Sequence, residues 1–214
     1  VNIPLWENKI PFNIQKTKWT VLVGETGCGK SWVLENYALF LSEKKVPFSM
    51  IHQEPYLYND TIVENIFLGQ EQTPEKIELA KFYLKEFGLN ILNENLDELL
   101  LLELGENGKK VSGGQAKRIS LIRSLVSDIE YVLWDDPFSS VDLLLESEIL
   151  GSLRKSELMD KKTFILTSHR LSTVKSCDEV VYLGKNEGII EQGNIINILN
   201  SGSKVDTFFE KQHI

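Results

Sequence analysis

Short apolar runs alternate along the chain with longer segments in which apolar residues recur at helical spacing. Their β-branched and aromatic content predicts buried strands at 19–23, 48–51, 131–134, 163–167 and 180–183. We expect helices at 30–41, 61–66, 74–87, 93–104 and 116–126, and a last amphipathic piece at 205–212 after a short hinge at 201–203. The alternation after Gly105 predicts βαβ units and a largely parallel sheet.

Composition narrows the class of protein. The chain has 214 residues, of which 42% are hydrophobic, enough for one sizeable core or a core with a small subdomain. The net charge of −8, without blocks of like charge, argues against a general affinity for nucleic acid or anionic lipid. Two cysteines, Cys28 and Cys177, are too few for a disulfide framework and favour a reducing, cytosolic setting.

No stretch approaches the roughly 20 apolar residues that a bilayer-crossing helix needs. The densest run, at 99–102, lies between Glu98 and Glu103, so we expect a buried helix face there. No signal peptide is visible, and the chain begins at Val1 rather than Met, which suggests a piece of a longer polypeptide. If the protein works at a membrane, we expect another segment to supply the spanning part.

A complete phosphate-loop motif, G-x-x-x-x-G-K-[ST], lies between the first strand and the first helix. It consists of Gly24, Glu25, Thr26, Gly27, Cys28, Gly29, Lys30 and Ser31. Glycines let backbone N–H groups and the helix N-terminus approach a phosphate closely. We expect Lys30 to reach the β- and γ-phosphates of a nucleoside triphosphate and the Ser31 hydroxyl to bind Mg²⁺. The alternative is an ordinary glycine turn before a helix.

Two carboxylates follow the apolar run at 131–134. Asp135 would lie at the C-terminal end of a buried strand, where a P-loop site holds Mg²⁺ and its waters. Asp136 comes directly after it. The alternative is a core strand followed by a chance acidic turn.

A third motif, at 111–115, precedes the helix at 116–126. The motif ends at Gln115. Ser112 offers a hydroxyl, Gly113 and Gly114 permit close backbone approach, and the helix that follows offers its positive end. Alone, this sequence would be a common loop.

Together, and in this order, the three motifs resemble the nucleotide-binding domain of ATP-binding-cassette (ABC) transporters, over nearly the whole chain. The resemblance implies an α/β fold: a P-loop NTPase core with a mainly parallel sheet, a reduced antiparallel β-subdomain and an inserted α-helical subdomain. It places the core at about 1–55 and 128–214 and the helical subdomain at about 56–127. It implies ATP and Mg²⁺ as cofactors. It also implies two partners, a second nucleotide-binding domain, whose ATP the segment at 111–115 would cap, and a membrane-spanning domain at the cytoplasmic face of a membrane.

Four further positions follow from the resemblance. Gln53 matches a glutamine that touches Mg²⁺ and signals to the membrane domain, and His169 matches a histidine that contacts the γ-phosphate. The loop at 139–142, ending at Asp142, matches one that couples the two sites of the dimer. Trp6 matches the aromatic residue that stacks on adenine, although its spacing to Lys30 is short. The plain alternatives are loop polar groups for Gln53 and His169, a helix cap for Asp142, and a core aromatic for Trp6.

Cys28 lies within the phosphate loop, near Lys30 and a helix N-terminus, where the pKa of a thiol can be lowered. This position predicts that a thiol alkylator blocks nucleotide binding and that ATP protects the thiol.

The chain departs from the family's pattern at two places. Only 22 residues separate Lys30 from Gln53, which implies a cut-down β-subdomain and resembles the exporter branch. The phrases at 58–66 and 135–142 resemble the first nucleotide domain of the multidrug-resistance-associated and cystic-fibrosis-regulator group, while 169–174 looks more like multidrug and lipid exporters. Asp136 stands where the family usually has the glutamate that orients the attacking water.

Aspartate is one methylene shorter than glutamate, which draws the carboxylate of Asp136 back by roughly 1.5 Å. We therefore expect tight ATP binding with slow hydrolysis in an exporter ATPase, with Lys30, Gln53, Asp136 and His169 around the reacting phosphate. One alternative is a non-catalytic ATP-sensing domain paired with an active partner. Another is a soluble ABC ATPase of DNA repair or translation, which the net charge of −8 disfavours.

Overall fold

The computed structural model describes residues 2–5, 8–157, 159–199 and 202–210. It contains two compact units. The first, here called the sheet unit, comprises Val1–Met50, Glu130–Asp136 and Arg154–Ile214. The second, here called the helical unit, comprises Ile51–Ile129 and Pro137–Leu153.

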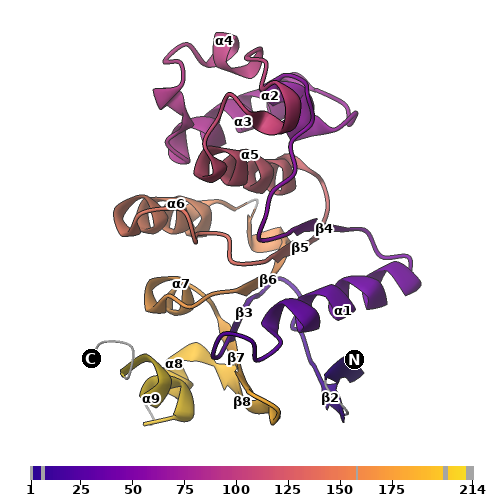
Figure 1. The fold of residues 1–214 in the computed structure, drawn as a ribbon, viewed down its shortest axis with the longest axis vertical. Helices are drawn as coiled ribbons and strands as arrows, with labels where there is room; N and C mark the ends of the chain where they lie inside the picture. Colours follow the sequence, from indigo (N-terminus) through magenta and orange to yellow (C-terminus); the bar gives the residue numbers. More distant parts are fainter. Residues whose placement is uncertain (1, 6–7, 158, 200–201, 211–214) are drawn as a thin grey trace. The chain divides into compact units, whose positions relative to one another are not determined.

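A six-stranded sheet with the order β4-β5-β6-β3-β7-β8 dominates the sheet unit (Figure 1). Its strands are β3 (Trp19–Val23), β4 (Phe48–Ile51), β5 (Tyr131–Trp134), β6 (Thr163–Thr167), β7 (Glu179–Gly184) and β8 (Gly188–Asn194). Strand β3 pairs in parallel with β6 and β7, and β5 pairs in parallel with β6. Strand β8 pairs with β7 in the antiparallel direction. The predicted, largely parallel sheet is thus confirmed.

Every residue of β3, β5 and β6 is buried, which explains why these strands are nearly continuous apolar runs rather than alternating ones. The helix α1 (Lys30–Glu43) contributes Val33, Leu34 and Leu41 to the core that Leu22 and Ile165 share. This core therefore fixes the helix that follows the phosphate loop against the strand that precedes it.

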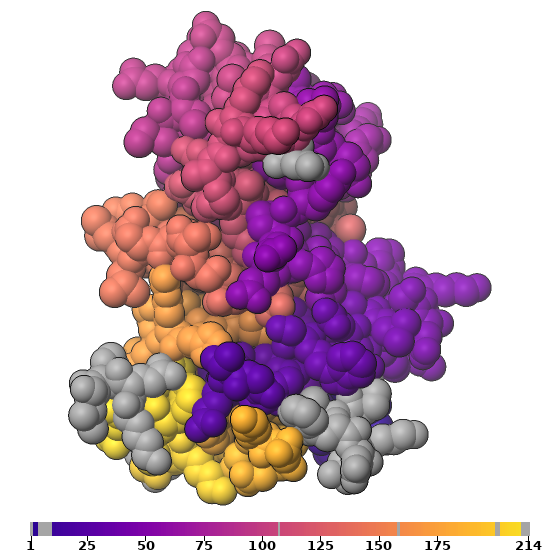
Figure 2. Space-filling view, viewed as in Figure 1, coloured from indigo at the N-terminus to yellow at the C-terminus, as the bar shows by residue number. Residues whose placement is uncertain are grey.

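A separate two-stranded antiparallel sheet, β1 (Asn2–Leu5) with β2 (Asn8–Pro11), packs near α1 and β8. Its small size agrees with the predicted reduction of the antiparallel part. At the other end of the chain lie η3 (Met159–Lys161), α7 (Leu171–Lys175), α8 (Ile195–Leu199) and α9 (Lys204–Glu210). Helix α8 packs on β8 and on α9, and these segments appear together in orange and yellow in Figure 2. Helix α9 covers most of the predicted piece at 205–212; its last two residues lie outside the described part of the chain.

The helical unit contains the following elements: α2 (Ile62–Phe67), α3 (Pro74–Glu86), η1 (Leu89–Ile91), α4 (Leu96–Leu100), η2 (Glu106–Gly108), α5 (Gly113–Val126) and most of α6 (Leu143–Lys155). Helix α5 packs against α2 and α3, as Figure 1 shows. Helix α3 begins at Pro74, with the Thr73 hydroxyl accepting from Lys76 N, and the chain turns at Gly88 with φ +64°.

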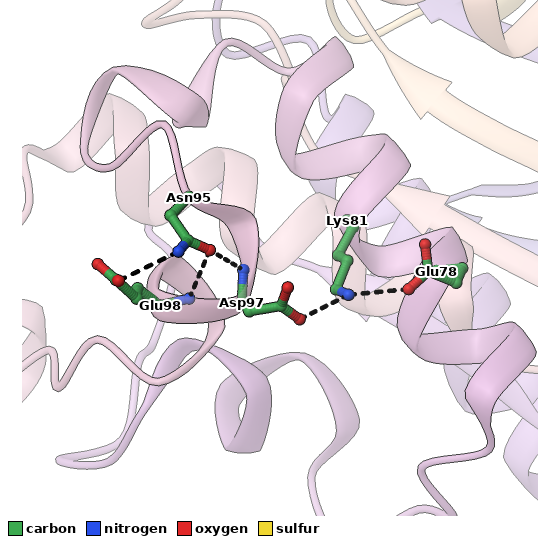
Figure 3. Close-up of polar contacts among 5 residues, drawn as sticks. All are labelled: Glu78, Lys81, Asn95, Asp97 and Glu98. Atoms are coloured by element: carbon green, nitrogen blue, oxygen red, sulfur yellow. Dashed lines mark hydrogen bonds and ion pairs between the residues drawn. The ribbon is translucent and has the colours of Figure 1, made fainter.

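The helix expected at 93–104 is wrong in length, because α4 spans only Leu96–Leu100. The Asn95 side chain accepts hydrogen bonds from the N–H groups of Asp97 and Glu98, which starts the helix late (Figure 3). The expected buried face also ends early, since Leu99 and Leu100 are buried but Leu101 is 67% exposed.

An ion-pair bridge holds α3 to α4. Lys81 Nζ lies 2.8 Å from Glu78 on its own helix and 2.6 Å from Asp97 on α4 (Figure 3).

Within the described ranges, none of the helices combines the length and apolar character needed to cross a bilayer.

Candidate nucleotide-binding site

Strand register brings three separate segments of the sheet unit to one edge of the sheet. In the parallel pairs, Leu22 lies beside Thr167 and Trp134 lies beside Leu166. The carboxyl ends of β3, β5 and β6 therefore lie side by side. The phosphate loop from Gly24, the pair Asp135–Asp136 and the segment Ser168–His169 leave the sheet from these ends. Open α/β sheets bind ligands at this edge, beyond the carboxyl ends of their strands.

The phosphate loop depends on glycine at defined points. Gly24 has φ +148°, and an added Cβ would collide with the Leu183 carbonyl oxygen and lie 2.7 Å from Cys28 Sγ. Gly27, with φ +79°, has no atom within 4 Å of an added Cβ, and Glu25 and Thr26 beside it are exposed. Gly24 is therefore required by packing, whereas Gly27 supplies backbone conformation next to open space.

Helix α1 begins at Lys30, directly after Gly29, whose φ is +98° and which has no side chain to cap the helix. The first N–H groups of a helix lack intrahelical partners, so this 14-residue helix presents donors toward the loop. Ser31 is exposed in the first turn, where its hydroxyl can reach a ligand.

Lys30 lies across the loop. Its Nζ donates to the carbonyl oxygens of Gly24, at 2.8 Å, and Glu25, at 3.0 Å. Burial lowers the pKa of the Lys30 ammonium below its ordinary value, and the charges of Cys28, Asp136 and Asp135 partly oppose this. The site therefore concentrates a positive charge whose hydration has been reduced, and such a charge favours an anion.

The structure corrects the expectation for Cys28. Its side chain is fully buried in the core, and burial raises the pKa of the thiol above its ordinary value. Lys30, whose Nζ lies 3.8 Å from the sulfur, only partly offsets this increase. Its position near a helix N-terminus suggested an activated thiol, but Cys28 belongs to the core that Leu22 and Val33 share.

Asp135 and Asp136 share a threonine that the sequence motifs did not indicate. The Thr167 hydroxyl donates to Asp135 Oδ1 at 2.7 Å and accepts from the Asp136 N–H at 2.8 Å. Asp136 has φ +45°, in the left-handed region that non-glycine residues seldom occupy. Thr167 thus fixes the carboxylate of one aspartate and the strained backbone of the other. A buried threonine at the end of β6 was the available signal.

His169 belongs to the same charged cluster. Burial lowers the pKa of its imidazole, the Lys30 ammonium lowers it further, and Asp136 and Asp135 oppose the shift. The side chain is therefore neutral near pH 7 and offers one donor and one acceptor. The structure brings together Lys30, Asp135, Asp136 and His169.

The residues at this edge fit a nucleoside triphosphate with Mg²⁺. An uncapped helix N-terminus, a loop that requires glycine and a buried lysine suit a polyphosphate. Among the described residues, no group of three or more His, Cys, Asp and Glu side chains could hold a metal ion. Mg²⁺ is commonly bound by one or two carboxylates together with substrate phosphates and waters, and Asp135 and Ser31 could supply protein ligands of that kind.

The segment at 111–115 lies in the helical unit and opens α5. Ser112 is the N-cap: its hydroxyl oxygen accepts from Gln115 N at 3.2 Å, and Gln115 Oε1 accepts from Ser112 N at 2.7 Å. An added Cβ at Gly113 would meet nothing within 4 Å, but at Gly114 it would lie 3.0 Å from the Ser140 carbonyl oxygen. The segment is thus a rigid helix start with one open and one packed glycine.

Asp142 caps the next helix. Its Oδ1 accepts from the N–H groups of Leu144, at 3.1 Å, and Leu145, at 3.0 Å, and the Leu145 bond is the main cause that lowers the pKa of this exposed carboxyl. Within this chain, Asp142 therefore acts as a helix cap, as one of the two interpretations of the sequence predicted. A coupling role for it stays a prediction.

Gln53 lies in the helical unit, just after β4, with an exposed side chain. Its backbone is held from α5, because Lys117 Nζ donates to the carbonyl oxygens of His52 and, at 3.1 Å, Gln53. Sequence patterns gave no sign of this buried lysine. Trp6, the predicted adenine-stacking residue, lies outside the described residues.

Comparison with known proteins gives consistent matches. A family model described as ABC transporter matches residues 8–139. The chain is 32% identical over 213 residues to the ATP-dependent lipid A-core flippase of Vibrio cholerae, covering 89% of this chain and 35% of the flippase. It is 34% identical over 185 residues to ABC transporter C family member 6 of Dictyostelium discoideum, covering 83% of this chain and 14% of that protein.

A solved structure described as a bacterial Atm1-family ABC exporter with ATP bound resembles the fold, with a TM-score of 0.79 and 23% sequence identity. The likeness covers 97% of this chain and 39% of that chain. The chain therefore spans a third or so of its matched flippase relative and less of the larger one. The predicted α/β fold is confirmed.

Proposed function

The chain belongs to the ABC transporter family, and on this basis we propose that it is the ATP-hydrolysing domain of an exporter. The domain would close head-to-tail with a second nucleotide-binding domain on two ATP molecules. The observation that carries this proposal is the cluster at the carboxyl ends of β3, β5 and β6. There the phosphate loop and Lys30 meet Asp135, Asp136 and His169.

We assign each residue of the cluster in the sheet unit a role that agrees with its position. Lys30 and the first N–H groups of α1 would bind the phosphates, and Ser31 and Asp135 would hold Mg²⁺. Neutral His169 hydrogen-bonds the γ-phosphate, while Asp136 orients the attacking water. Bound ATP would supply the bond to be cleaved, and Mg²⁺ would neutralise phosphate charge. On family grounds, Gln53 would add a contact to Mg²⁺, and Ser112–Gln115 would cap the phosphate held by the partner domain.

The partners follow from the same proposal. A membrane-spanning domain would receive the movement, which places the chain at the cytoplasmic face of a membrane. We propose the helical subdomain at about 56–127 and the core at about 1–55 and 128–214. ATP would drive closure because it binds the closed dimer better than the open one, and hydrolysis would remove that preference. Relatives named as lipid A-core flippases and as ABC C family members leave both exporter subgroups open.

Hydrolysis by this domain should be slow. The carboxylate of Asp136 is roughly 1.5 Å shorter in reach than that of glutamate, and misplacement of a catalytic group by about 1 Å can cost on the order of a hundredfold. The left-handed backbone at Asp136 and its Thr167 hydrogen bond prevent the main chain from moving forward to compensate.

The test measures ATP affinity and turnover of the chain, Asp136→Glu and Lys30→Ala with Mg²⁺ present. We expect the wild type to bind ATP tightly, Asp136→Glu to hydrolyse it about ten- to a hundredfold faster, and Lys30→Ala to lose binding. Wild-type turnover equal to that of Asp136→Glu would refute slow hydrolysis. Absence of ATP binding would refute the proposed function.

A second candidate is an ATP-sensing domain whose partner carries the active glutamate, and the short carboxylate of Asp136 favours it. In that case Asp136→Glu would remain inactive unless the partner is added. A soluble ABC ATPase of DNA repair or translation remains the third alternative, and measured binding to duplex DNA or ribosomes would revive it.

A further inference from the structure

Lys117 is a lysine in the interior of the helical unit. It lies in the second turn of α5 and is 1% exposed, which places it among the largest fully buried side chains of the described residues. Lysine side chains are seldom fully buried unless their donors are satisfied. Its Nζ reaches more than 60 residues back along the chain, to the carbonyl oxygens of His52 and Gln53.

These bonds fix the backbone of a segment whose side chains are free to reach outward. The segment leaves β4 at Ile51, and the side chains of His52, Gln53 and Glu54 are exposed. Hydrogen bonds from a charged nitrogen to a carbonyl oxygen are stronger than neutral ones, and burial strengthens them further. The Gln53 side chain therefore projects from a main chain that α5 holds.

The same helix holds the continuation of this segment. Arg123 Nη2 donates to the Tyr56 carbonyl oxygen at 3.3 Å, and its Nε donates to Asn65 O at 2.7 Å. The buried Asn65 side chain in turn accepts from Tyr58 N at 2.7 Å and donates to Tyr58 O at 3.1 Å. Of these anchors, Lys117 is the one that acts on Gln53 itself.

Helix α5 also carries Ser112–Gln115 in its first turn, and Lys117 lies two residues after Gln115. A helix of 14 residues closed by a capping box behaves as one rigid element. A shift of the Gln53 main chain would therefore be passed to the start of α5 through the Lys117 side chain.

We propose that Lys117 is a positioning residue that couples Gln53 to the Ser112–Gln115 segment, so that the two change position together when nucleotide binds. The inference rests on the proposed function, because it assigns a route between two segments of that site. It requires Lys117 to act through Gln53 and not through general stability of the helical unit.

A double-mutant cycle tests this requirement. Lys117→Met keeps the volume of the side chain and removes its donors, and we expect kcat for ATP to fall about tenfold with less than about a twofold change in KM. Gln53→Ala should reduce kcat by a similar factor. The double variant should lose no more than about threefold beyond either single variant, because both changes break one route. An unchanged kcat in Lys117→Met, or losses that multiply, overturns the inference.

Lys81→Met is the matched control, since Lys81 is another bridging lysine of the helical unit but lies far along the chain from both segments. Its kcat should stay within about twofold of wild type even if its Tm falls. A loss equal to that of Lys117→Met would mean that stability, not coupling, sets the activity, and would overturn the inference.

Hydrogen exchange on the wild-type chain decides the matter if Lys117→Met does not fold. Addition of Mg²⁺ and ATP should change exchange in the peptides at 51–58 and 112–120 together. A change in one alone, or in neither while ATP is bound, overturns the coupling. ATP binding is measured separately with a fluorescent analogue; if the wild type does not bind it, the proposed function fails, and the inference fails with it.

Discussion

Alanine at Gly113 or Gly114 separates two roles of the Ser112–Gln115 segment: the start of a stable helix, and close approach to the ATP of a partner domain. Both glycines lie in the first turn of α5, and neither has a positive φ. A methyl group at Gly113 would extend into open space, whereas at Gly114 it would lie 3.0 Å from the Ser140 carbonyl oxygen. The two substitutions are chemically identical and differ only in what the new carbon meets.

The structure sets the sign of each stability change. Alanine is favoured over glycine within a helix by roughly 0.5–1 kcal/mol, so Gly113→Ala should raise Tm by about 1–4 °C. At Gly114 the same gain is opposed by overpacking against backbone, which costs about 1–3 kcal/mol. Gly114→Ala should therefore leave Tm unchanged or lower it by up to several degrees.

The effect of Gly113→Ala on activity should be opposite in sign to its effect on stability. If the segment approaches a partner's ATP, the Gly113 methyl occupies space that a phosphate oxygen needs, and turnover should fall at least about tenfold in a protein that is more stable. Thermal unfolding and steady-state ATPase assays on the same samples measure both quantities, and ATP affinity is checked by titration. Full turnover in a stabilised Gly113→Ala would refute close approach at this segment.

Two further predictions concern the sheet unit. Because folding lowers the pKa of His169, the unfolded chain binds more protons than the folded chain below the ordinary pKa of about 6.5, so the free energy of unfolding should fall as pH drops through that region. The difference in Tm between pH 5.5 and pH 7.5 should therefore be smaller in His169→Gln than in the wild type. An identical difference contradicts the assignment. Because the Cys28 thiol is buried and its pKa is raised, iodoacetamide should label it slowly in the folded chain and rapidly in urea. Mass spectrometry of the Cys28 peptide measures both rates, and equal rates would contradict the burial.

Sequence patterns predicted the strands that are buried on both faces but missed β8 (Gly188–Asn194). Its residues alternate weakly between buried and exposed, and its place depends on pairing with β7 through a turn in which Asn186 and Gly188 have positive φ. The helix at 93–104 failed for a local reason: Asn95 accepts from N–H groups ahead of it, and the chain beyond Leu101 turns to form a bridge between Thr61 and Glu103.

Within the site, the sequence was informative wherever backbone conformation demands a residue type. The glycines of the phosphate loop and the carboxylates after β5 occupy the positions that the strand register predicts. The partners of these groups were not visible. In the sequence, Thr167 resembles any other buried strand residue and Lys117 resembles any other polar residue of a helix. Their hydrogen bonds could not be predicted, because only the folded chain brings the acceptors to them. The same limit explains Cys28, whose neighbours along the chain did not indicate its burial.

The short carboxylate at Asp136 has two physical explanations with different consequences. Aspartate tolerates the left-handed region better than glutamate, since its side chain can bond locally, and a non-glycine residue there costs roughly 1–2 kcal/mol. Backbone strain at φ +45° would therefore favour aspartate whatever the reaction requires. If strain is the reason, Asp136→Glu should lower Tm while raising turnover. If strain does not distinguish the two residues, turnover should rise with Tm unchanged, because the Thr167 hydrogen bond to the Asp136 N–H does not depend on the side chain.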